Sequence, residues 1–268
     1  MIPRPSDTPV PHVWEKLDRA DKHIEELSRL IADYTSDASR VASDPDTDRF
    51  NEFLRTHNGR PTPDIFGVIA GEVFYQWRSA LDNLVCAFII FDGATPSDKS
   101  QFPIREHQIR DKDARRRYEG QIKGIGRNSV REFIEGLQPY NTRNTHGLRL
   151  LIIRDKCNRD KHRSIDIQST SIAGSIEFDI LGRLEVSTVR RRGGTTQQTI
   201  EVPLAQKKAN VSLRTLVVFK DWPMQTKTAV EVVPALTDLS TFVRGILAIG
   251  ENHLRHPASK RVGTSRRT

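Results

Sequence analysis

The stretch from about Asp64 to Phe91 constrains the fold more than any other part of the chain. Over about 28 residues its apolar side chains recur at steps of three and four, which is the period of one face of an α-helix. The Thr-Pro-Asp sequence at 62–64 favours a helix start, and Asp92-Gly93 favours a helix end. A helix this long and apolar needs other helices to cover it, so the sequence predicts a helical bundle. The apolar positions are Ile65, Ile69, Val73, Trp77, Ala80, Leu81, Leu84 and Phe88.

A second helix is predicted from about Val13 to Tyr34. Its apolar residues follow a 3-4-3-4-3 spacing, the seam of a helix pair or a short coiled coil. The seam has only about two and a half heptads, so pairing within one chain is favoured over a zipper between two chains. A homodimer is the alternative. A loop is expected over Ser36–Asp48, and four prolines among the first eleven residues predict an extended arm over 1–12. The seam residues are Leu17, Ala20, Ile24, Leu27, Ile31 and Tyr34.

Helices and strands are segregated along the rest of the chain. Helices at about Lys112–Lys123, Asn128–Leu137 and Thr145–Asp160 complete a helical bundle over 13–163. From Ile165 onward apolar residues alternate with polar ones, which predicts a C-terminal antiparallel β-sheet and a closing helix over 164–256, packed with the bundle as one unit. The fold class is therefore α+β. The strands are expected at about 165–169, 176–180, 184–188, 199–202, 211–220 and 228–233, with a hairpin tip at 191–194, and the closing helix at about Leu236–Leu254.

Positive charge is concentrated in a few places. The net charge is +8, and arginines outnumber lysines by 30 to 12. This bias is typical of a GC-rich genome, and it also suits phosphate binding, because a guanidinium group binds phosphate through two hydrogen bonds. Half of the excess lies in a tail over 257–268, which is predicted to be disordered, and compact clusters lie at 115–117 and 190–192. A weak attraction to nucleic acid is expected, but no zinc finger, basic zipper or helix-turn-helix is present.

Several classes of protein are excluded. The longest apolar run, Leu84–Phe91, is too short to cross a bilayer, and the N-terminal residues lack the apolar core of a secretory signal. Two cysteines, Cys86 and Cys157, do not make a disulfide scaffold or a cysteine-only zinc site. We therefore expect a cytoplasmic protein with no membrane partner, no metal and no cofactor.

A candidate polar site lies on the helix that begins at Thr145. Its apolar stripe is predicted to run through Leu148, Leu151 and Ile152. At steps of three and four this stripe continues onto polar residues, so the inward face of the helix is expected to become polar. These polar residues are Asp155, Asn158, Arg159 and His162, with Lys161 and Arg163 beside them.

The long second helix offers polar partners for this face. Glu72, Gln76, Ser79 and Asn83 form one stripe along it, with Arg78 and Asp82 alongside. Because packed helices lie about 8–10 Å apart, Asn158 and His162 are expected within about 8 Å of Arg78 or Asp82. The two polar stripes would enclose a wet cleft at one end of the bundle. The alternative is a structural network that caps the helix and anchors the sheet.

Four ordered motifs resemble a large family of uncharacterised bacterial proteins that is frequent in actinobacteria. They are GEVFYQWRSALDNLVCAFI at 71–89, QFPI at 101–104, GLQPY at 136–140 and NRDKHR at 158–163. Members of that family carry an "LRSALDHLV" helix and a later "QPY…NxDKHR" sequence. The resemblance spans about 14–180 and implies no particular activity.

A more distant resemblance is to HEPN domains, helical bundles that include many metal-independent ribonucleases of toxin and defence systems. Their motif is an arginine followed four to six residues later by a histidine, and this chain departs from that spacing. The resemblance implies a catalytic role for His162 with Arg159 or Arg163. The polar stripes themselves add Asn158 as a candidate catalytic residue, and the candidate binding residues are Arg78, Asp82, Asp155, Lys161 and Arg163. The expected partner is RNA or another phosphate-bearing ligand. A non-enzymatic interaction module and a sensor of a phosphate-bearing small ligand are the alternatives.

Overall fold

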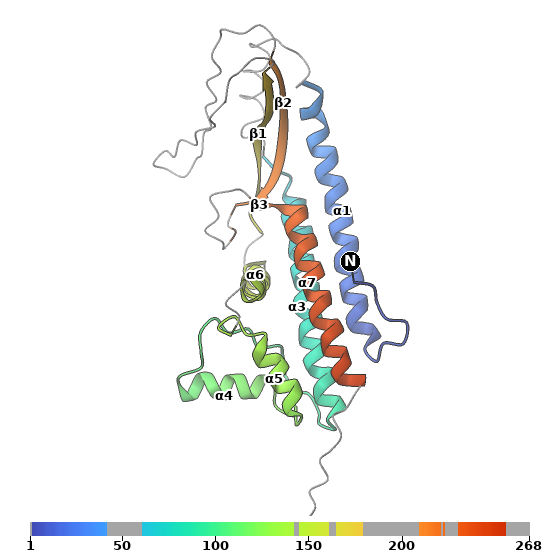
Figure 1. Cartoon of the computed structure of the whole chain (residues 1–268), viewed down its shortest axis with the longest axis vertical. Helices are drawn as coiled ribbons and strands as arrows, with labels where there is room; N and C mark the ends of the chain where they lie inside the picture. Colours follow the sequence, from blue (N-terminus) through green and yellow to red (C-terminus); the bar gives the residue numbers. More distant parts are fainter. Residues whose placement is uncertain are drawn as a thin grey trace, which may run out of the picture. The chain divides into compact units, whose positions relative to one another are not determined.

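The computed structural model describes residues 2–41, 61–141, 145–160, 165–178, 209–220, 222 and 230–255. Within these ranges the helices precede a small antiparallel sheet and one helix closes the chain, which confirms the α+β fold (Figure 1). The predicted hairpin tip at 191–194 and the basic tail at 257–268 lie outside the described residues. The helices are α1 (Pro11–Val41), α3 (Asp64–Phe91), α4 (Lys112–Gln121), α5 (Asn128–Gly136), α6 (Thr145–Asp160) and α7 (Val232–Arg255), and the strands are β1 (Ile167–Phe178), β2 (Ala209–Phe219) and β3 (Val230–Glu231).

The chain forms two compact units. The first comprises Met1–Glu26, Gly67–Ile165 and Val233–Thr268, and the second comprises Leu27–Phe66 and Asp166–Val232. The first unit holds the helices that carry the candidate site, and the second holds the sheet.

Helix α3 has the bounds and the buried face that its apolar period predicts. Val73, Trp77 and Leu84 are fully buried, whereas Ile65 at its start is exposed. In α1 the seam residues from Leu17 to Leu27 are buried within the chain, as expected for an intramolecular helix pair. Helix α1 is longer than predicted, since it continues to Val41 through residues expected to begin a loop.

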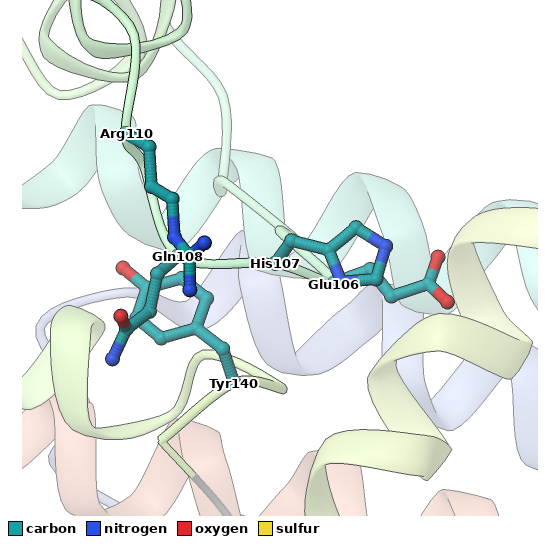
Figure 2. Close-up of a pocket in the computed structure, with 5 residues that line it drawn as sticks. All are labelled: Glu106, His107, Gln108, Arg110 and Tyr140. Carbon is teal, nitrogen blue, oxygen red and sulfur yellow. The ribbon is translucent and has the colours of Figure 1, made fainter.

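The segment from α3 to α5 forms a smaller packed region. Gly124, between α4 and α5, has a φ of 101°, and a Cβ there would lie 2.9 Å from the Cγ2 of Ile89. Glycine is therefore required on both conformational and steric grounds. The loop that leads from α3 into α4, together with Tyr140 after α5, lines a surface pocket (Figure 2).

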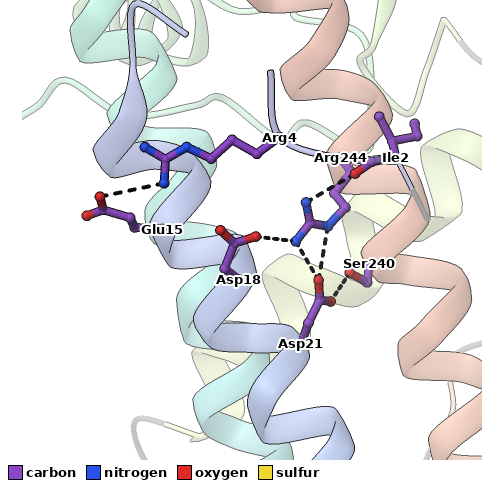
Figure 3. Close-up of polar contacts among 7 residues, drawn as sticks. All are labelled: Ile2, Arg4, Glu15, Asp18, Asp21, Ser240 and Arg244. Atoms are coloured by element: carbon purple, nitrogen blue, oxygen red, sulfur yellow. Dashed lines mark hydrogen bonds and ion pairs between the residues drawn. The ribbon is translucent and has the colours of Figure 1, made fainter. Parts of the chain in front are cut away.

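Helices α1 and α7 are joined by a buried network of charged groups (Figure 3). Arg244 of α7 donates to Asp21 at 2.5 and 3.0 Å and to Asp18 at 2.6 Å. It also donates to the backbone carbonyl of Ile2 at 3.1 Å, and Ser240 donates to the other oxygen of Asp21 at 2.5 Å. Each buried charge thus has an opposite charge or a hydrogen bond, as burial requires.

Among the described helices, α7 is the one that is long and apolar enough to cross a membrane by length and composition. That criterion is weak evidence, because core helices of soluble proteins also meet it. Arg244 and Glu251 of α7 are buried against α1, where the Trp14 indole donates to Glu251 at 3.0 Å. These partners balance the two buried charges of α7.

The second unit contains a three-stranded antiparallel sheet in the order β1-β2-β3. Ile167 pairs with Phe219 at one end of the β1–β2 ladder, and Phe178 pairs with Ala209 at the other. The sequence predicted two short strands where β1 is continuous, because the register irregularity at Gly174/Glu177 interrupts the alternation without ending the strand. Tyr34 packs edge-on against Phe66 with ring centroids 5.6 Å apart.

Candidate functional site

The C-terminal end of α6 lies directly against the backbone of α3. A Cβ added to Gly71 would lie 2.1 Å from Oδ1 of Asp160, and one added to Gly67 would lie 2.5 Å from the carbonyl oxygen of Ile165. Gly67 and Gly71 are one helical turn apart, so they present a side-chain-free face of α3. This face positions the start of the NRDKHR sequence at 158–163.

Ionisable groups from three helices meet at this junction. The Nδ1 atom of His23 on α1 lies 3.3 Å from Oε2 of Glu72 on α3 and 3.7 Å from Oε2 of Glu26. His23 is buried, whereas both glutamates are exposed. Burial and the nearby charge of Glu72 raise the pKa of Asp160 on α6. An imidazole and carboxylates in this arrangement can accept, donate and hold protons.

The predicted inward face of α6 is confirmed at Ile152, which is buried, but is otherwise wrong by about one residue. The helix buries Leu150, Ile153 and Cys157, whereas Asp155 and Asn158 are exposed. The reason is the apolar run at 148–153, in which five of six residues are apolar and several phases of the helical period fit equally well. The observed buried stripe still follows steps of three and four.

This correction brings the polar stripe of α6 to the protein surface. Arg154 and Asn158 are four residues apart on the solvent side, and Arg154 donates to the neighbouring carboxylate of Asp155 at 2.7 Å. Arg159 is partly buried. Lys161, His162 and Arg163 lie outside the described residues.

Arg78 and Asp82 have partners in the loop after α3. Arg78 lies 2.9 Å from Asp82 and donates to the side chain of Gln101 at 3.2 Å. Asp82 in turn accepts the backbone N–H of Phe102 at 2.8 Å. The pair therefore fixes the start of the QFPI sequence at 101–104.

Gln138 of the GLQPY sequence holds the other end of the same loop. Its amide donates to the carbonyls of Pro103 and Ile134, each at 2.9 Å, and its carbonyl accepts the N–H of Arg105 at 3.0 Å. Gln138 is fully buried, so these bonds replace water for three backbone groups. Three of the four motifs thus meet around one loop.

Sequence reasoning missed two features of this region. His23 flanks the α1 seam, and it is buried because two helices cover a wider face of α1 than a single seam provides. The pocket beyond Arg105 consists of loop residues that carry no periodic signal. Within the described residues, no cluster of three or more His, Cys, Asp or Glu side chains could hold a metal ion.

Comparison of the chain with protein-family models, curated proteins and solved structures finds no match. The resemblances to the bacterial family and to HEPN domains therefore stay predictions.

Proposed function

We propose that this is a cytoplasmic, HEPN-like protein that binds RNA and cleaves it without a metal ion at the end of α6. The observation that carries the proposal is the exposure of Asp155 and Asn158 on α6, whose last residue, Asp160, interacts with Glu72 of α3. A substrate can reach exposed side chains, whereas a structural network would be buried. Asp155 is exposed and bonded to its neighbour Arg154, which weakens the structural alternative.

The proposed chemistry needs only side chains of this chain. The 2′-hydroxyl oxygen of a ribose attacks the adjacent phosphorus, and the bond from phosphorus to the 5′-oxygen of the next nucleotide breaks. One general base removes the proton from the 2′-hydroxyl, and a general acid supplies a proton to the leaving 5′-oxygen. His162 is the proposed acid or base, Arg159 stabilises the charge on the phosphate, and Asn158 orients it. The products carry a 2′,3′-cyclic phosphate and a 5′-hydroxyl.

Cleavage of labelled single-stranded RNA in EDTA tests the proposal. His162→Ala should lower the rate by about 10²–10⁴-fold, which is the contribution of a general acid or base. His12→Ala is the matched control, because His12 is an exposed histidine at the start of α1 and its loss should leave the rate unchanged. Wild-type protein that cleaves none of a set of mixed-sequence RNAs would exclude the nuclease, and so would a His162→Ala variant with full activity.

A further inference from the structure

A pocket lies where the QFPI loop runs on towards α4. It has a volume of about 380 Å³ and is lined by Glu106, His107, Gln108, Arg110 and Tyr140. The volume falls within the range of small-molecule sites, about 300–1,000 Å³. Arg110, Gln108 and Tyr140 gather on one side of the pocket, and His107 and Glu106 lie on the other (Figure 2).

Arg110 lines the pocket, and Arg105 lies beside it, since its charge acts on the lining residue Tyr140. Burial lowers the pKa of Arg105, and the charges of Arg117 and Arg154 lower it further, so three guanidinium groups repel one another here. Arg154 pairs with Glu106 at 3.5 Å and with Asp155. In the described part of the chain, Arg105, Arg110 and Arg117 form no ion pair.

Arg105 also has an unused hydrogen-bond donor. Its Nη2 donates to the neutral side chain of Gln121 at 2.9 Å, whereas its Nε is buried and has no hydrogen-bond partner. Arg105 therefore contributes positive charge beside the pocket without being one of its lining residues. An anion in the pocket would reduce the repulsion among these arginines.

The walls of the pocket are held in place before any ligand binds. Gln138 fixes the backbone of Arg105, and the Tyr140 hydroxyl donates to Glu135 at 2.6 Å. Burial and the bond to Glu135 raise the pKa of Tyr140, which therefore stays neutral and presents an aromatic ring. Aromatic rings and an amide side chain are the groups that stack on nucleobases and hydrogen-bond to their edges.

We propose that this pocket binds a nucleoside 5′-monophosphate, with its phosphate at Arg110 and its base between Tyr140, His107 and Gln108. Arginine suits the phosphate because its N–H groups bond two phosphate oxygens at once. The phosphate can belong to a free nucleotide or to the 5′ end of an RNA. None of the residues proposed for cleavage lines the pocket, although Glu106 pairs with Arg154, one turn before Asn158 on α6, and nucleotide binding does not rest on RNA cleavage.

Isothermal titration calorimetry with the full chain tests this proposal. The probes are AMP, GMP, CMP and UMP, the matching nucleosides, and inorganic phosphate. At least one mononucleotide should bind, its nucleoside should bind much more weakly, and the affinity should fall as salt increases. Binding of none of the four mononucleotides, or equal binding of nucleotide and nucleoside, would overturn the proposal.

Two variants identify the site. Arg110→Ala should weaken binding by about 10-fold or more, since a hydrogen bond to a charged group is lost. Arg116→Ala is the control, because Arg116 is an exposed α4 arginine paired with Asp113, and its loss should leave the affinity unchanged. Arg110 is exposed, so its removal should leave the melting temperature unaltered. Equal loss in the two variants would show non-specific attraction only and would refute the pocket.

Two RNA hexamers, with and without a 5′-phosphate, distinguish the sources of the nucleotide. Tighter binding of the phosphorylated hexamer than of the mononucleotide assigns the pocket to RNA ends, and the reverse order assigns it to free nucleotides. The titrations are repeated with His162→Ala. Nucleotide binding that persists in this variant supports the pocket, whether or not the wild type cleaves RNA. The proposals of nucleotide binding and of RNA cleavage are then tested independently of each other. Nucleotide binding lost in His162→Ala but retained in Arg110→Ala would place the ligand at the end of α6 and overturn the pocket.

Discussion

Replacing Arg244 with methionine tests whether the buried network between α1 and α7 stabilises the helical unit as its geometry implies. Arg244 is 3% exposed and Asp21 is 7% exposed, so both charges have left bulk water. The substitution keeps much of the side-chain volume but leaves the Asp21 carboxylate with the hydroxyl of Ser240 and no buried positive charge. Removing one member of a buried ion pair costs about 3–5 kcal/mol. That is a large share of the roughly 5–15 kcal/mol that stabilises a typical domain.

Urea denaturation followed by circular dichroism measures this cost. Arg116→Ala is the control, because Arg116 and Asp113 form an exposed pair whose loss should change the free energy of unfolding by less than about 1 kcal/mol. The double variant Arg244→Met/Asp21→Leu lacks the uncompensated Asp21 carboxylate, so this variant should be more stable than Arg244→Met alone. A cost below about 1 kcal/mol for Arg244→Met, or a double variant less stable than the single one, would refute this reasoning.

Two further changes probe the site. Gln138→Ala removes the hydrogen-bond partners of the Pro103 carbonyl and the Arg105 N–H. The free energy of unfolding should therefore fall by about 1–3 kcal/mol, and the affinity for mononucleotides should fall with it. An unchanged midpoint of urea denaturation would contradict this expectation. Asp160→Asn should raise the melting temperature at neutral pH, because the raised pKa of Asp160 shows that its charged form is unfavourable in the folded state. This gain should vanish as the pH falls towards 3.8, since the Asp160 carboxyl of the wild type then becomes protonated in both the folded and the unfolded state. A gain that is the same at every pH would show that charge is not its cause.

The sequence is most informative where one helix face alone is apolar. Helix α3 begins at Asp64 and ends at Phe91 as predicted, since its start and stop residues flank a clear period. In α1 the regular spacing from Leu17 to Leu27 also identifies the buried side. The end of α1 at Val41 could not be predicted from propensity, because serine and aspartate near the end of a helix equally suit a loop.

Prediction of the candidate site is poorer for two physical reasons. The run at 148–153 on α6 is apolar on most sides, so its phase is settled by packing, which buries Leu150 and Ile153 and exposes Asn158. The pocket depends on loop contacts between residues far apart in the chain, such as Gln138 with Arg105. Such contacts produce no periodic pattern in the sequence from which they could be predicted.

The absence of side chains at Gly67 and Gly71 also determines which substitutions α3 can tolerate. Every other residue type adds at least a Cβ. At Gly67 that atom would lie 2.5 Å from the backbone carbonyl oxygen of Ile165, whereas at Gly71 it would meet the side-chain carboxylate of Asp160, the last residue of α6. Random replacement of Gly67 should therefore return glycine almost alone among folded clones, because backbone cannot move aside as the Asp160 side chain can at Gly71, while the exposed neighbour Val68 should accept many residues. The tolerance of α3 to change at Gly67 would thus be set by the backbone of a residue about a hundred positions further along the chain.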